Sequence, residues 1–272
     1  MASTTAPTRG LSRRQRRQAS LGVQYAVFVL ALLAAALVAD WDAILENFAR
    51  VPIARDMFPE ILTIALKNTV VYTLAGFTFG LVLGLVLALM RLSSVAPYRW
   101  VATLYVEIFR GLPALLIFIL VGVGVPLAFP GAVVPGGRVG QVPLALGLVA
   151  AAYMLETFRA GIQAVPKGQV EAARSLGMSH TRAMISIVIP QAFRIIIPPL
   201  TNELVLLFKD SSLVFALGVT LQEKELTKFG RDLAGTKANV TPIVLARLCY
   251  LIITIPLGHL ARRLEARNAK AR

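Results

Sequence analysis

Long apolar segments alternate with short polar ones along most of the chain. Several apolar segments lack charged residues over about 17 to 25 positions, which is enough for a helix to cross a bilayer. The pattern predicts an all-α integral membrane protein with six transmembrane helices. The predicted spans comprise residues 21–39, 68–90, 111–129, 142–155 with a continuation towards Arg159, 194–219 and 243–260.

The first span has two interpretations. Residues 1–20 are polar and are predicted to form a disordered, basic cytoplasmic tail, and the apolar run 21–39 follows them. Basic residues before the run and small side chains at 34–36 also suit a cleaved signal peptide. The length of the run favours a retained N-terminal transmembrane helix. The basic residues of the tail are Arg9, Arg13, Arg14, Arg16 and Arg17.

Composition indicates a membrane environment. The chain has 57% hydrophobic residues and a mean hydropathy of +0.71, so it is far more apolar than an average soluble domain. Its net charge of +14 does not indicate nucleic-acid binding, because the basic residues form short groups between apolar segments. Cys249 is the only cysteine, which leaves neither a disulfide framework nor a cysteine-based metal site. Membrane lipid is the expected partner of the apolar segments.

The distribution of basic residues predicts the orientation, because loops rich in Lys and Arg tend to face the cytoplasm. The segments assigned to the cytoplasm, both termini included, are 1–20, 91–99, 164–190 and 266–272. The segments assigned to the outside are 40–60, 130–141 and 220–240. The last of these is expected to include a helix along the membrane surface. The topology predicts a multi-pass membrane protein.

The second span contains a glycine at every fourth position, namely Gly76, Gly80 and Gly84. Residues four apart lie on one face of a helix, and glycines there let another helix approach closely. The pattern favours a packing role without direct function.

The longest polar interval between two apolar segments is 164–190. It is predicted to hold a short helix, because residues 169–176 contain no helix breaker. Gly177 suits a left-handed C-terminal cap. Ser179 can cap a second helix, which Pro190 is expected to interrupt.

Four residues of the short helix have properties that suit a docking surface. Ala172 and Ala173 leave little side chain between the backbone and a partner, while Glu171 and Arg174, three positions apart, share a face. An ordinary solvated loop helix is the alternative that these features alone leave open.

Polar residues also occur within the fifth apolar segment. An ionisable residue at the bilayer centre costs roughly 2.5–3.5 kcal/mol on insertion scales. Lys209 and Asp210 are therefore expected either to pair in a hinge where the helix breaks, or to line a translocation path. Ser211 and Ser212 would add hydroxyl groups to such a path. The preceding pair Asn202 and Glu203 favours gating or bonding between helices, and Pro198-Pro199 disfavours a regular helix at the start of the span.

The docking segment resembles a known motif. Glu171-Ala172-Ala173, followed by Gly177, Ile187 and Ile189-Pro190, is similar to the EAA loop of ATP-binding-cassette importer permeases, with Ile189 where the family usually has Leu. In that family the loop is a coupling helix that docks into a groove on a separate ATPase subunit. The resemblance therefore implies the same role for 164–190, with Glu171, Ala172, Ala173, Arg174 and Gly177 at the contact.

Further motifs narrow the resemblance to the branch that serves uptake of histidine, glutamine, arginine and glutamate. Asn202 and Lys209-Asp210-Ser211-Ser212-Leu213 are similar to that branch, with Ser211 in place of the usual Thr. Arg110-Gly111-Leu112-Pro113 resembles its Arg-Gly-Thr-Pro, and Ile117 and Val170 stand where Gln and Trp are common. The other matching residues are Ala152-Tyr153, Glu156, Phe158-Arg159, Gly161, residues 165–169 and Pro190-Gln191. The resemblance covers 58–265 as an importer permease core, to which residues 21–39 add one helix.

The resemblance implies the following partners and energy source. The chain contains no Gly-x-x-x-x-Gly-Lys-Ser/Thr sequence that would cradle a nucleotide phosphate. No cofactor is expected on this chain, and Mg-ATP is expected on partner ATPase subunits. A second permease subunit, in a homodimer or a heterodimer, and an external solute-binding protein would complete an importer of polar amino acids. A secondary transporter driven by an ion gradient and a sensor or scaffold without transport are the alternatives.

Overall fold

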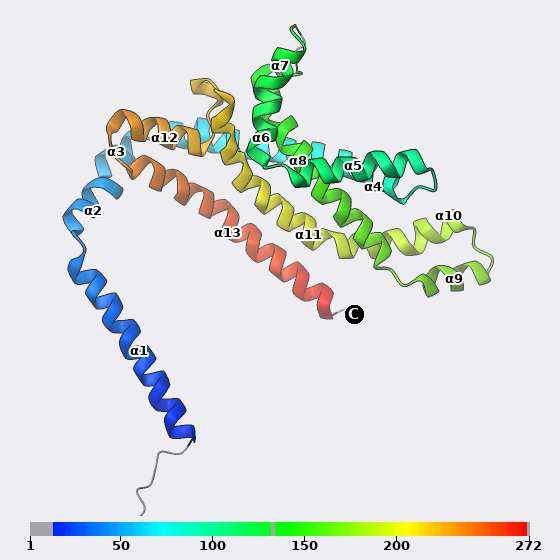
Figure 1. The fold of residues 1–272 in the computed structure, drawn as a ribbon, viewed down its shortest axis with the longest axis horizontal. Coiled ribbons are helices and arrows are strands. Elements are labelled where there is room, and N and C mark those ends of the chain that lie inside the picture. Colours follow the sequence, from blue (N-terminus) through cyan, green and yellow to red (C-terminus); the bar gives the residue numbers. More distant parts are fainter. Residues whose placement is uncertain (1–12, 132–133, 271–272) are drawn as a thin grey trace, which may run out of the picture. The chain divides into compact units, whose positions relative to one another are not determined.

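The computed structural model describes residues 13–131 and 134–270, and every regular element in these residues is helical (Figure 1). This confirms the predicted all-α class. The chain divides into two units, residues 1–49 and 50–272. Arg9 and Arg272, assigned above to the terminal tails, lie outside the described residues.

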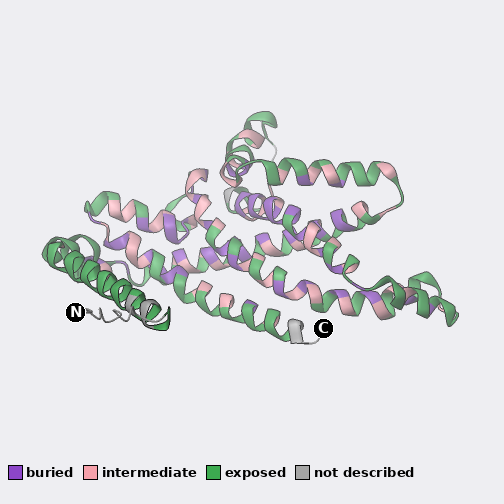
Figure 2. Ribbon diagram, turned by 60° about the horizontal axis from the view of Figure 1, so that its bottom comes forward, coloured by how far each residue is buried: buried purple, intermediate pink, exposed green. Residues whose placement is uncertain are grey.

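The first unit contains α1 (Arg13–Val38) and α2 (Trp41–Phe48). Its apolar part, Ser20–Val38, is long enough to cross a membrane, in agreement with the first predicted span, and none of it is buried within the chain (Figure 2). The prediction of a disordered tail up to residue 20 is wrong from Arg13 onward, because the arginine-rich segment already belongs to α1. Apart from glycine and proline, few residues stop a helix once it has begun, and arginine is a good helix former.

The second unit is a helical bundle. Its elements are α3 (Val51–Asp56), η1 (Ile61–Leu66), α4 (Lys67–Leu92), α5 (Ala96–Gly111), α6 (Ala114–Ile119), η2 (Leu120–Gly124), α7 (Val125–Ala128), α8 (Gly137–Gln163), α9 (Lys167–Ser175), α10 (His180–Ala183), η3 (Met184–Val188), α11 (Ile189–Asp210), η4 (Ser211–Leu217), η5 (Leu221–Glu223), α12 (Leu226–Lys237) and α13 (Thr241–Lys270). The segments η1, η2 and η3 are π-helical, whereas η4 and η5 are 3₁₀-helical.

Five helical segments of the described chain are long and apolar enough to cross a membrane, and the number is six if a bent helix pair is counted as one span. The bent pair is 96–111 with 114–128, which are bent by 106° relative to each other. The predicted span 111–129 contains the second arm of this pair, and the extended residue Leu112 and Pro113 separate it from the first arm, α5, which was not predicted as part of a span. The predicted loop 91–99 is also shorter than expected, because Pro97 lies in the first turn of α5, where a proline is tolerated.

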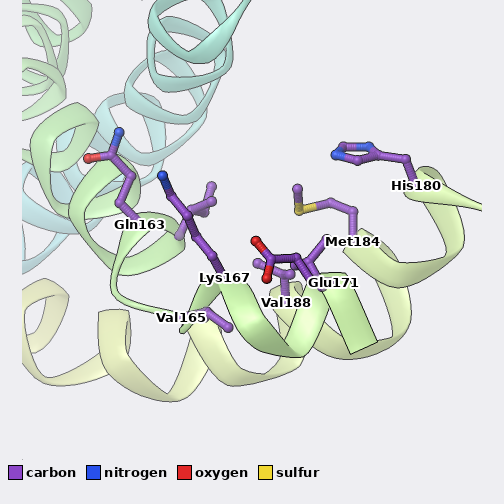
Figure 3. Close-up of a pocket in the computed structure, with 9 residues that line it drawn as sticks. Gln163, Val165, Lys167, Glu171, His180, Met184 and Val188 are labelled. Atoms are coloured by element: carbon purple, nitrogen blue, oxygen red, sulfur yellow. The ribbon is translucent and has the colours of Figure 1, made fainter. Parts of the chain in front are cut away.

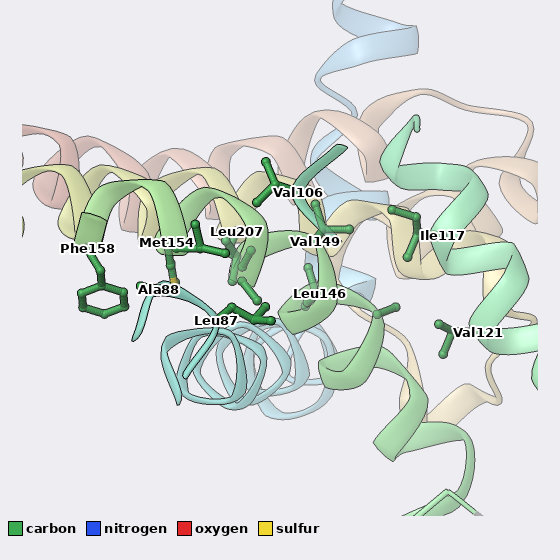
Figure 4. Packing of buried hydrophobic residues seen from close by; sticks show 14 of the residues in the cluster. Leu87, Ala88, Val106, Ile117, Val121, Leu146, Val149, Met154, Phe158 and Leu207 are labelled. Atoms are coloured by element: carbon green, nitrogen blue, oxygen red, sulfur yellow. The ribbon is translucent and has the colours of Figure 1, made fainter. Parts of the chain in front are cut away.

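The core of the bundle is built around α4 and α8 (Figure 4). A Cβ atom placed on Gly76 would lie 2.7 Å from Leu146 Cβ, and one on Gly80 would lie 2.9 Å from Ala150 Cβ. Gly84 faces Met154 in the same way. The glycines thus let the two backbones approach closely, as the sequence pattern predicts. Side chains of α5, α6 and α11 complete the apolar core around this pair.

The prolines interrupt the helices less than predicted. Pro198 and Pro199 lie inside α11, and Pro256 lies inside α13. Pro190 follows the π-helical turn η3, yet residues 180–217 continue as one apolar span. Packing neighbours and local π-type adjustment can satisfy the backbone groups that a proline leaves free, and sequence reasoning overestimated the effect of these prolines. The predicted C-terminal tail 266–272 is likewise helical as far as Lys270.

A polar bridge ties α4 to α8 at one end of this pair. Glu156 accepts from Arg159, three positions later on the same helix, at 2.7 Å, and it also pairs with Arg91 at the end of α4. Arg159 donates in turn to Gln163 Oε1 at 2.7 Å. The carboxylate of Glu156 therefore holds two guanidinium groups from two helices.

Candidate functional site

The segment that the sequence marks as a docking element folds as α9, a turn and α10. After α9 the chain closes a Schellman cap: Gly177 adopts φ +85°, its N–H donates to the Arg174 carbonyl, and the Met178 N–H donates to the Ala173 carbonyl. Ser179 then caps α10 by accepting from the Arg182 N–H at 3.3 Å. The predicted capping roles of Gly177 and Ser179 are confirmed.

The two alanines of α9 face different ways. Ala173 is 3% exposed and lies against the chain's own helices, whereas Ala172 is exposed. Ala172 shares its face with Gly168 and Ser175, four positions before it and three after, and all three are exposed. The expectation that both alanines face a partner is therefore wrong for Ala173, whose small side chain serves packing within the subunit.

The charged residues of α9 have no partner in the described part of the chain. The side chains of Glu171 and Arg174 are exposed and make neither a hydrogen bond nor an ion pair there. Leu176, at the end of the helix, is 86% exposed. A small-residue face, two unpaired charges and an exposed apolar side chain together form a surface suited to a protein partner.

A cavity of about 490 Å³ lies beside this helix, between it, the end of α8 and the segment α10–η3 (Figure 3). Apolar side chains form much of its lining, and Lys167, Glu171 and His180 supply polar groups. Sequence reasoning missed His180 and Met184 as neighbours of Glu171, because they approach it only when the chain folds back after Gly177. The lining residues are Ile162, Gln163, Val165, Lys167, Val170, Glu171, His180, Met184 and Val188.

The polar residues of the fifth span form a stripe on α11. Asn202 and Glu203 lie seven positions before Lys209 and Asp210, so the two pairs share one helix face two turns apart. Asn202 and Lys209 are exposed, and Glu203 and Asp210 are half-buried. Among the described residues none of these four side chains makes a hydrogen bond or a salt bridge, so the paired hinge, one of the two alternatives for Lys209 and Asp210, is not observed there.

The two serines after the stripe occupy different environments. The α-helical geometry ends at Asp210, and Ser211 begins the 3₁₀ turn η4. Ser211 is buried, and its hydroxyl donates to the Phe208 carbonyl at 2.7 Å. Ser212 is half-buried. The helix thus changes form where the sequence indicates a hinge, and the Ser211 hydroxyl is engaged inside the subunit.

A turn of four residues, 176–179, joins the docking helix to the span that carries the polar stripe. Residues 180–217 form a single apolar span that begins beside α9 and carries the stripe towards its other end. The 22 residues of α11 correspond to about 33 Å of helix.

Among the described residues no group of three or more His, Cys, Asp or Glu side chains could hold a metal ion.

Comparison with known proteins assigns the chain to a family. Residues 80–270 match the model of the family described as "binding-protein-dependent transport system inner membrane component". The chain belongs to this family. It is accordingly a permease component of a transport system and a multi-pass protein of the bacterial plasma membrane, as the sequence predicts.

The permease has relatives of similar length. It is 37% identical over 202 residues to the probable glutamine ABC transporter permease protein GlnM of Bacillus subtilis, covering 73% of this chain and 90% of that protein. It is 35% identical over 236 residues to the glutamate/aspartate import permease protein GltK of Escherichia coli, covering 85% and 98%. A crystal structure of an amino acid ABC transporter with histidines matches with a TM-score of 0.69 at 31% identity, over 79% of this chain and 96% of that one.

Proposed function

We propose that this permease imports polar amino acids of the glutamate, glutamine, histidine and arginine class, driven by a separate ATPase. The names of the relatives GlnM and GltK support the solute class. The observation that carries the mechanism is an exposed docking helix whose charges have no partner among the described residues, followed directly by the membrane span that carries the polar stripe.

The docking helix α9 is the contact for the ATPase in this proposal. The face formed by Gly168, Ala172 and Ser175 lets a partner surface reach the helix backbone, and Glu171 and Arg174 offer charges for pairing. ATP and Mg²⁺ bind the ATPase, and this chain supplies no catalytic residue. Closure of the ATPase dimer moves α9, and differential contact in two states of the bundle lets the nucleotide bias the equilibrium between them.

The polar stripe of α11 is the wall or gate of the translocation path. Charged groups facing lipid carry a cost of roughly 2.5–3.5 kcal/mol each on insertion scales. Glu203, Lys209 and Asp210 therefore require either water or another subunit beside them. A second permease subunit opposite the stripe would enclose an aqueous passage, into which an external solute-binding protein delivers the amino acid. With both termini in the cytoplasm, α9 lies on the side of the ATPase.

Reconstitution tests this function directly. The permease, its ATPase and its binding protein are placed in proteoliposomes, and uptake of labelled amino acids is measured with and without ATP. We expect ATP-dependent uptake that Glu171→Arg abolishes because the charge of the docking surface is reversed. Uptake at the wild-type level in this variant would refute the role of α9, and uptake without ATP would indicate an ion-driven transporter instead.

A further inference from the structure

The docking helix packs against the segments that precede α11 in the chain. Ala173 is buried, and Val170 packs against the main core cluster, which includes Val188 of η3 as well as residues of α8. Helix α9 contacts α10 and η3. The cavity described above lies beside these contacts, and residues of α8, α9, α10 and η3 line it. The contacts with α10 and η3 connect α9 to the span that carries the polar stripe.

One side chain bridges the two elements. Gln191, in the first turn of α11, donates through Nε2 to Gln169 Oε1 on α9, and it also donates to the Ile187 carbonyl at 3.0 Å. Gln169 is exposed and Gln191 is half-buried. Ile187 belongs to the π-helical turn η3, so a single amide group joins the docking helix, the π-turn and the start of α11.

The bridge spans a π-helical turn of the long span that is followed by a proline. A π-turn departs from regular α-helical hydrogen bonding. Pro190, directly before Gln191, lacks the N–H that would stiffen this turn. A displacement of α9 could be absorbed there as a change of helix angle, unless a further contact holds α9 and α11 together.

We propose that Gln191, through Gln169, is the positioning residue that makes α9 and α11 move as one body. This inference rests on the proposed function, because it concerns how motion of the docked helix reaches the polar stripe. Neither glutamine touches the nucleotide or the solute in this scheme. Loss of the bridge leaves the docking surface intact and lets the π-turn yield, so that ATP is hydrolysed with less transport.

The test compares Gln191→Leu and Gln169→Leu with the wild type in the reconstituted complex. Three quantities are measured: binding of the ATPase to the permease, the rate of ATP hydrolysis, and the amino acid taken up per ATP. We expect ATPase binding to stay at the wild-type level and uptake per ATP to fall by roughly 2- to 10-fold, as for loss of one net hydrogen bond. Gln169 lies on the exposed helix, so its variant leaves the membrane span unaltered.

Two further variants sharpen the test. The double variant Gln169→Lys, Gln191→Glu places an ion pair at the same position and is expected to recover uptake per ATP relative to either charged single variant. Gln222→Leu makes the same change of side chain at an exposed glutamine of η5. This control is expected to behave as the wild type.

The outcomes separate the inference from the function on which it rests. Uptake per ATP that is unchanged in both leucine variants would overturn the inference. So would a loss of uptake that follows a loss of ATPase binding, since that result would assign the glutamines to docking. Failure of the wild-type permease to bind the ATPase would refute the proposed function itself, and the inference with it.

Discussion

The hydroxyl of Tyr250 in α13 donates a 2.7 Å hydrogen bond to the carboxylate of Glu225, the N-cap residue of α12. Glu225 is fully buried, and its carboxylate also accepts from the backbone N–H groups of Thr227 and Lys228. Thr69 of α4 accepts from the Leu226 N–H next to it. The Glu225 side chain thus joins α12 to α13 without a cation as its direct partner among the described residues, and the neighbouring Leu226 N–H joins α12 to α4.

Glu225 should make the stability of the protein depend on pH. Burial raises the pKa of Glu225 from its ordinary value of 4.5 to about 7, although the hydrogen bonds from Tyr250, Thr227 and Lys228 lower it in part. The folded state therefore binds this proton more tightly than the unfolded state. The contribution is fully present below about pH 4.5 and is lost as the pH rises through about 7, a difference of about 3 kcal/mol.

Thermal unfolding of the purified protein in detergent, followed from pH 5 to pH 8, checks this prediction. The wild type should lose stability over this interval, and Glu225→Gln should lose less, because its amide does not titrate. Glu60→Gln, which neutralises an exposed acid, should keep the wild-type slope. Equal slopes for the wild type and Glu225→Gln would contradict the prediction.

The close approach of α4 and α8 predicts that Gly80 does not tolerate a large side chain. A Cβ atom there would lie 2.9 Å from Ala150 Cβ and 3.1 Å from the Gly147 carbonyl oxygen. Gly80→Leu should therefore separate the helices and lower stability by about 3 kcal/mol or more, beyond the usual 1–3 kcal/mol of overpacking, because backbone opposes it. Gly235→Ala, in α12 with nothing within 4 Å, should be neutral or slightly stabilising. Melting temperatures of the two variants decide the matter, and a stable Gly80→Leu protein would disprove the contact.

The double ion pair of Glu156 predicts an asymmetric response to mutation. Glu156→Gln leaves Arg91 and Arg159 facing each other without the carboxylate between them. The three side chains are 21–32% exposed, so solvent screens part of the repulsion, and a loss of about 1–3 kcal/mol is expected. Arg91→Met in the Glu156→Gln background should restore part of this loss. Unfolding of the single and double variants measures it, and a double variant less stable than Glu156→Gln would be inconsistent with charge repulsion.

The opposite orientations of Ala172 and Ala173 predict different consequences for the same substitution. Ala172→Trp adds bulk to the exposed face, so it should reduce ATPase binding by at least about tenfold, or about 1.4 kcal/mol, without changing the melting temperature. Ala173→Trp must displace α9 from its packing, and it should lower the melting temperature as well. Binding assays and thermal unfolding on both variants test this difference. Indistinguishable behaviour would mean that the two alanines share one environment.

Local signals in the sequence were sufficient for the docking helix. Gly177 and Ser179 determine where α9 ends and α10 begins, because a left-handed cap and an N-cap each depend on one residue and its immediate backbone. The charges of Glu171 and Arg174 and the small side chains beside them can likewise be read directly from the sequence. The orientation of Ala173 does not, since it depends on η3, which packs against α9 only after the chain reverses direction.

Features that depend on distant neighbours were not predictable. The sequence could not indicate that Gln169 and Gln191 meet, because the two are separated by 22 positions and the motifs that contain them do not show which side chains come into contact. Helix α5 was not predicted, because its mixture of apolar and polar residues is typical of neither a transmembrane span nor a loop. The bend after Gly111 shows that α5 is one arm of a bent helix pair. The prolines of α11 are tolerated for a similar reason: helix breaking by proline is a local rule, and packing overrides it.

Gly76, Gly80 and Gly84 of α4 form a glycine ladder that faces α8. This ladder should limit evolutionary changes in the length of α4 more strictly than changes in its composition. Insertion or deletion of one residue between Gly76 and Gly84 would rotate the remainder of α4 by about 100° and turn one end of the ladder away from α8. Outward-facing positions of the same helix can drift freely among apolar residues. Indels in related subunits should therefore collect in the connecting loops, while the spacing of this helix stays fixed.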